Sequence, residues 1–62
     1  MEPKELIGKR ARDMVTGFSG EITGYWICKT GSDRVLLEDV DNTGRPVEFW
    51  ADQERVEIFE EG

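Results

Sequence analysis

The segment that most constrains the fold is residues 15–26, VTGFSGEITGYW, in which three glycines alternate with residues that favour β-strands. Glycine adopts backbone conformations that other residues avoid, so glycines clustered beside strand-forming residues mark a tight turn that leads into a twisted strand. We therefore expect a positive φ at Gly17 or Gly20. In a chain of 62 residues, such a turn favours a small β-barrel.

The alternation of apolar and polar residues extends this turn into a complete set of elements. A helical turn is expected at residues 3–7, ending at Gly8, and a short 3-10 turn at 52–55. Five strands are expected, at 9–15, 21–29, 34–39, 47–52 and 56–59. This order predicts an all-β fold, a five-stranded SH3-like small barrel with a short N-terminal helical turn. The barrel would be a single domain over residues 1–62, with a frayed tail at 60–62.

The inward positions of these strands define the expected core. Its members are Val15, Ile22, Val35, Leu37, Val47, Phe49, Val56 and Ile58. In the strand at 21–29, Ile22 and Trp26 would point one way and Tyr25 and Ile27 the other. Both faces of that strand then carry large apolar groups, which suggests that one face meets another subunit or a ligand. Asp13 is expected to accept hydrogen bonds from the backbone of the turn that follows it.

The residue composition argues against a metal centre, a cofactor and a catalytic site. The chain has no histidine, and Cys28 is its only cysteine, so a disulfide and a zinc site are both unexpected. Residues 39–44, DVDNTG, resemble the start of a calcium loop, with acids at its first and third positions and glycine at its sixth, but Trp50 stands at the twelfth position, where the bidentate glutamate belongs. A hairpin turn bonded by Asp41 is expected there instead. The carboxylates are scattered over strand ends and turns, so we expect no catalytic residues.

The charges are distributed unevenly along the chain, whose net charge is −6. Residues 1–35 carry six basic and five acidic side chains, whereas residues 36–62 carry two basic and nine acidic ones. Such an acidic chain argues against nucleic-acid binding, which needs clustered lysine and arginine. The charged N-terminus and the lack of a long apolar run argue against a signal peptide and a membrane partner, and favour a cytoplasmic protein.

A ligand-binding site and self-association are predicted together. A domain this small fills its interior with its own side chains, so a cavity for a small ligand would have to lie between subunits. Aromatic rings could stack on a ring system, an acid could accept hydrogen bonds, and arginine could clamp a phosphate. The expected site has six residues: Trp50, Glu48, Tyr25, Lys9, Arg10 and Arg12. Surplus aromatic residues predict a homo-oligomer.

Residues along most of the chain resemble a group of small phage and prophage proteins. The segment GKRARDMVTGFSG at 8–20 is followed by TG at 23–24, GRP at 44–46 and WADQERVE at 50–57. The group shares the pattern VRDKVTGFxGxxTG … DGKPxexxWFDExRLE. The resemblance spans most of residues 6–58. It implies a fold and a phage origin, and therefore the cytoplasm of a bacterial host, more than it implies an activity.

A more distant resemblance is to the type II dihydrofolate reductases of plasmids and integrons. These are SH3-like barrels that assemble as tetramers around a pore binding folate and NADPH. The resemblance rests on Gly8, Arg10 and Arg12 and on GEITGYWIC at 20–28. It places the family's pore-lining Val-Gln-Ile-Tyr motif at residues 47–50, VEFW. Glutamate replaces the family's glutamine there, and a ring of carboxylates would repel phosphates, which argues against reductase activity.

Three functions remain open at this point. The first is a non-catalytic, homo-oligomeric barrel that binds a small ligand, of which a nucleotide is one candidate, at subunit junctions. The second is a protein–protein adaptor or host-takeover factor whose acidic face engages a host protein. The third is a reductase of the type II kind.

Overall fold

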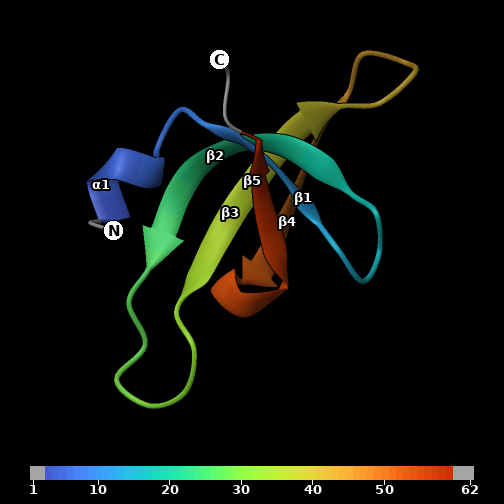
Figure 1. Cartoon of the computed structure of the whole chain (residues 1–62). Helices are drawn as coiled ribbons and strands as arrows, with labels where there is room; N and C mark the ends of the chain where they lie inside the picture. The colour runs from blue at the N-terminus through green and yellow to red at the C-terminus, as the bar shows by residue number, and fades with distance from the viewer. Residues whose placement is uncertain (1–2, 60–62) are drawn as a thin grey trace.

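A computed structural model describes residues 3–59, and the tail expected at 60–62 lies outside the described residues (Figure 1). The chain forms one short helix, five strands and a 3-10 turn. The elements are α1 (Pro3–Leu6), β1 (Arg10–Asp13), β2 (Ser19–Trp26), β3 (Arg34–Val40), β4 (Pro46–Asp52), η1 (Gln53–Arg55) and β5 (Val56–Phe59). The predicted all-β fold with a short N-terminal helical turn is confirmed.

The five strands form one antiparallel sheet in the order β4-β3-β2-β1-β5. Strand β2 holds the sheet together, because its first residues pair with β1 and the rest of it pairs with β3. It curves strongly between these two partners (Figure 1). This curvature rolls the single sheet into a small SH3-like barrel, in which β4 and β5 remain edge strands that do not pair with each other within residues 3–59.

Two glycines before and within the start of β2 act in different ways. Gly17 has a φ of +82°, which confirms the expected left-handed position in the turn. Gly20 has no positive φ, but a Cβ atom there would lie 2.5 Å from the backbone carbonyl oxygen of Glu38. Gly20 is therefore required for the close approach of β2 to β3.

The core lies on the inner face of the curved sheet. Its buried apolar residues are Leu6, Ala11, Ile22, Val35, Leu37 and Ala51, and the partly buried Phe18, Tyr25, Phe49, Val56 and Ile58 pack against them. The expectation for Val15 is wrong, because β1 ends at Asp13 and Val15 lies in the following turn with 71% of its surface exposed. Val47 is only half-buried.

A bulge in β2 corrects the predicted orientation of its aromatic residues. Ile22 pairs with Leu37, but Gly24 pairs with Leu36, so Thr23 is an extra residue in the strand. Beyond the bulge the inward and outward positions are exchanged. Tyr25 therefore packs against the core, whereas Trp26 is 57% exposed on the outer face. This is the reverse of the predicted arrangement.

Candidate functional site

The register of the sheet places three glutamates side by side on its outer face. Glu21 lies directly opposite Glu38, and Glu38 lies directly opposite Glu48. We call these three residues, which come from β2, β3 and β4, the acid row. Like charges at directly opposed positions destabilise a sheet. The row is completed across β1 and β5 by Arg10, opposite Glu21, and by Phe59.

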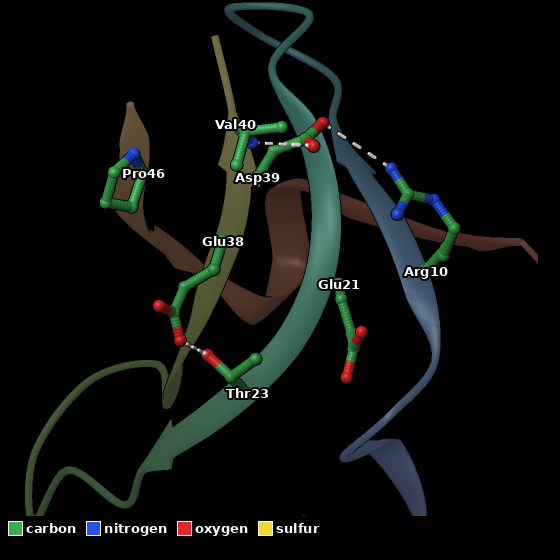
Figure 2. Close-up of a pocket in the computed structure, with 7 residues that line it drawn as sticks. All are labelled: Arg10, Glu21, Thr23, Glu38, Asp39, Val40 and Pro46. Atoms are coloured by element: carbon green, nitrogen blue, oxygen red, sulfur yellow. Dashed lines mark hydrogen bonds and ion pairs between the residues drawn. The ribbon is translucent and has the colours of Figure 1, made fainter. Parts of the chain in front are cut away.

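A groove of about 340 Å³ runs beside the acid row (Figure 2). Its lining consists of Arg10, Glu21, Thr23, Glu38, Asp39, Val40 and Pro46. Arg10 is the one cation in this lining, and its Nη2 lies 3.5 Å from Asp39 Oδ2. The Thr23 hydroxyl donates a hydrogen bond to Glu38. We call this feature the acidic groove, since three carboxylates face one guanidinium there.

Two residues of the acid row are left without a partner. Among residues 3–59, the side chains of Glu21 and Glu48 form neither a hydrogen bond nor an ion pair. Figure 2 shows Glu21 between the Thr23–Glu38 pair and the Asp39–Arg10 pair, joined to neither. The outer face therefore has carboxylates available to an incoming cation.

An exposed tryptophan pair lies next to the acid row. Residue Trp50 is opposite Leu36 in the sheet, and its ring lies 5.9 Å from that of Trp26, centroid to centroid, at an interplanar angle of 85°. Trp50 is 41% exposed and Trp26 is 57% exposed. Edge-to-face packing of this kind is a favourable aromatic geometry. We call Trp26, Leu36 and Trp50 the tryptophan patch.

Gly24 forms the floor of the tryptophan patch. A Cβ atom at this position would lie 3.3 Å from Leu36 Cβ and 3.6 Å from Trp50 Cη2. The missing side chain therefore lets Leu36 pack closely on the β2 backbone, beside the Trp50 ring.

The six residues expected to form a ligand site do not all come together. Trp50 and Glu48 are neighbours on the outer face of β4, and Arg10 lies across the sheet in line with Glu48. Tyr25 lies on the opposite, inner face. Its hydroxyl donates to Asp33 Oδ2 at 2.9 Å and lies 2.8 Å from the side-chain amide oxygen of Gln53.

The environment of Tyr25 gives it a structural role. Burial, together with the neighbouring Asp33 carboxylate, raises the pKa of the Tyr25 phenol above its ordinary value. Asp33 also accepts a hydrogen bond from the backbone N–H of Cys28 at 3.0 Å, and its carbonyl accepts from that of Gln53 at 2.9 Å. Tyr25 and Asp33 thus fasten the loop between β2 and β3 to η1.

The remaining basic residues of the expected site lie elsewhere. Arg12 forms an exposed ion pair with Glu57, at 3.3 Å. Lys9 lines a second cavity of about 230 Å³ with Gly8, Arg10 and Phe59. Of the three basic residues of the expected site, Lys9, Arg10 and Arg12, only Arg10 lines the acidic groove.

A separate carboxylate, Asp13, is completely buried and fully bonded. Arg55 donates to both of its oxygens, at 3.0 and 2.9 Å, and the N–H and hydroxyl of Thr16 donate at 2.9 and 2.6 Å. The expected bond from Asp13 to the following turn is confirmed. Burial raises the pKa of Asp13, but the hydrogen bonds from Thr16 and the pairing with Arg55 outweigh burial and bring the pKa below its ordinary value.

The turn at residues 41–44 is also bonded by its aspartate, as expected. Asp41 Oδ1 accepts from the hydroxyl and N–H of Thr43, at 2.6 and 2.8 Å, and from the N–H of Arg45 at 3.0 Å. These bonds, that of the Thr43 hydroxyl foremost, lower the pKa of Asp41. Gly44 has a φ of +84°. The carboxylate is used within a hairpin turn.

Sequence reasoning missed four residues of the outer face: Glu21, Trp26, Leu36 and Glu38. The alternation within β3 places Leu36 and Glu38 outward, and this signal was present in the sequence. Leu36 and Glu38 lie beside Glu21 and Trp26 only because of the register between β2 and β3. No local pattern in the sequence shows this register.

Within residues 3–59, no group of three or more His, Cys, Asp or Glu side chains is arranged to hold a metal ion. In the same range, no helix is long and apolar enough to cross a membrane. The chain matches no protein-family model, no curated protein and no solved structure with which it was compared. The function is therefore inferred from the site itself.

Proposed function

We propose that this protein is a non-catalytic binding module that docks another protein on the outer face of β2, β3 and β4. The observation that carries the proposal is the tryptophan pair, held in a fixed edge-to-face geometry yet exposed on the sheet. Tryptophan is among the residues most enriched where binding energy concentrates at protein interfaces. An adaptor with an acidic face is the hypothesis from the sequence that this surface supports best.

The surroundings of the tryptophan patch support this proposal. Polar groups lie on both sides of it, with the acid row on one side and the Arg34–Asp52 ion pair, at 3.3 Å, on the other. An apolar centre within a polar rim is the usual anatomy of a protein interface. The three groups with shifted pKa values, Asp13, Tyr25 and Asp41, all lie outside the acidic groove and are bonded within the fold.

Selection of binding peptides tests this function whatever the partner is. A random peptide library is selected on the immobilised protein, and the enriched peptides are then measured against Trp26→Ala and Trp50→Ala. We expect both variants to lose at least about tenfold in affinity, as truncated interface tryptophans commonly do. The control is Met14→Ala, since Met14 is also exposed, at 62%, but lies in the turn after β1.

Two further results complete this test. Melting curves of the variants show whether each remains folded. If no peptide is enriched, or if the enriched peptides bind the folded tryptophan variants as well as the wild type, the outer face is not the binding surface.

A second candidate function is the homo-oligomeric barrel with a small ligand at its subunit junctions. The observation that favours it is the same exposed tryptophan patch, because a second copy could cover it. Sedimentation at micromolar concentration tests the assembly. A monomer would reject this candidate, while a dimer or tetramer that Trp50→Ala dissociates would support it over the docking of another protein.

A further inference from the structure

We infer that the partner binds as a basic segment, with an apolar side chain on the tryptophan patch and lysine or arginine side chains over the acid row. This inference rests on the proposed function and names the chemistry of its partner. It is carried by the position of the acid row and the tryptophan patch on one face, in adjoining rows of the sheet.

The charge of the outer face is complementary to such a segment. Glu21 and Glu48 have no bonded partner among residues 3–59, and Glu38 is bonded to a neutral hydroxyl. Arg10, which lies opposite Glu21 in the sheet, forms its ion pair with Asp39 instead. An incoming lysine or arginine would relieve the repulsion along the row and would be attracted by the net charge of −6.

The spacing of the two features limits the geometry of the segment. Leu36 and Glu38 are two residues apart on β3, as are Trp50 and Glu48 on β4, so the two rows lie about 7 Å apart. Alternate side chains of an extended peptide have the same spacing. An extended segment with an apolar residue at one position and a basic residue two positions further along, on the same face, therefore matches both rows at once.

The exposed tryptophan rings also favour a cationic partner. A lysine or arginine head group is attracted to the face of a tryptophan ring, and the attraction grows when the contact is shielded from water. Glu48 is adjacent to Trp50 on the same face of β4, so a single cation could contact both. A second copy of this chain would instead bring another net charge of −6 to this face.

The test uses three synthetic peptides of equal length in which Ser occupies every second position and the positions between are filled, in turn, by Lys and Val, by Glu and Val, or by Lys and Gly, so that the two alternating residues lie on one face of the extended peptide. Binding to the wild-type protein is followed by calorimetry and by tryptophan fluorescence. We expect the Lys–Val peptide to bind most tightly, the Lys–Gly peptide to bind more weakly because it cannot cover the tryptophan patch, and the Glu–Val peptide not to bind. Raised salt should weaken the Lys–Val complex.

Matched variants show whether binding of the Lys–Val peptide depends on the charges of the acid row or on the net charge of the whole protein. The double variant Glu38→Gln, Glu48→Gln removes two charges of the acid row, and the control Glu5→Gln, Glu54→Gln removes two exposed charges on α1 and η1. We expect the first to weaken Lys–Val binding about tenfold and the control to change it less than about twofold. Trp50→Ala should also weaken it about tenfold.

The possible results distinguish this inference from the function on which it rests. Equal binding by the two double variants, or preference for the Glu–Val peptide, overturns the inference of a basic partner. If Trp50→Ala still weakens binding in that case, the outer face remains the docking surface. A dimer in sedimentation that Trp50→Ala dissociates shows that a second copy is the occupant, which also overturns the inference. If none of the three peptides binds, the basic segment is rejected, and the library selection alone decides the function.

Discussion

Two clusters of side chains that contain carboxylates have opposite environments in this small barrel: the Asp13 cluster, made of Asp13, Thr16 and Arg55, and the acid row. Asp13 is buried, and four hydrogen bonds from Thr16 and Arg55 satisfy it. The acid row lies on the outer face, where glutamates of neighbouring strands are opposed and two of them have no bonded partner within residues 3–59. The Asp13 cluster joins β1 to the end of η1, whereas the acid row contributes a single side-chain bond within residues 3–59, from Thr23 to Glu38.

This difference indicates that the Asp13 cluster contributes to the stability of the fold, whereas the acid row is available for binding. Arg55 is 42 positions from Asp13 in the chain, so their pairing ties the end of β1 to the residue just before β5. The opposed glutamates of the acid row repel one another, and this repulsion lowers the stability of the fold. Groups that a fold holds at an energetic disadvantage are typical of functional sites. Four predictions test whether the two clusters differ in this way, starting from the one with the largest effect.

The largest expected effect is that of Asp13→Ala on stability. The substitution leaves the Arg55 guanidinium and both Thr16 donors without their acceptor in a partly buried place. We expect the melting temperature to fall by more than about 10 °C. The control is Arg12→Ala, which breaks an exposed pair with Glu57 and should change it by only a few degrees. Equal effects of the two substitutions would remove the distinction between the clusters.

The second prediction concerns the loss of stability in acid. The pKa of Asp13 in the folded protein lies below its ordinary value of 3.8, so its contribution is fully present above that pH. The contribution is lost as the pH falls through the folded pKa. In urea titrations at decreasing pH, the stability difference between the wild type and Asp13→Asn should therefore shrink below about pH 4. A difference that stays constant down to about pH 2 would contradict this assignment.

Much of the fold could be predicted from the sequence, because each strand has a local pattern. Val35 and Leu37 alternate inward on β3, and the glycine turn before β2 is visible in the composition. The prediction for Val15 was wrong because β1 ends two residues earlier than its pattern indicates, at Asp13. Local alternation does not show where pairing with a neighbour stops.

The candidate site was predictable only in part, for the same reason. Trp50 and Glu48 were identified from one strand, whereas Tyr25 was assigned to them wrongly, since one extra residue, Thr23, reverses the faces of β2. The pairing of Asp13 with Arg55 also spans most of the chain. Register and long-range pairing are properties of the assembled sheet.

The third prediction perturbs the outer face alone. In Gly24→Ala, the added Cβ would lie 3.3 Å from Leu36 Cβ, so Leu36 must give by a few tenths of an ångström, and we expect the Trp50 ring, which lies in ordinary contact at 3.6 Å, to shift with Leu36. We expect the near-ultraviolet circular dichroism of the tryptophan pair to change while the free energy of unfolding stays within about 1 kcal/mol of the wild type. A spectrum identical to that of the wild type would show that Gly24 does not set the geometry of the patch.

The smallest expected effect, and the only stabilising one, is that of Glu48→Gln. Glu48 lies on the edge strand β4 opposite Glu38, and its side chain has no bonded partner among residues 3–59, so the change removes repulsion without breaking a contact. We expect the free energy of unfolding to rise by about 0.3 kcal/mol at low salt, and this gain to disappear at high salt. The control Glu54→Gln removes an equal charge from η1 and shows how much of the gain comes from net charge alone. If Glu48→Gln is less stable than the control, the acid row contributes to the fold, and its contrast with the Asp13 cluster is lost.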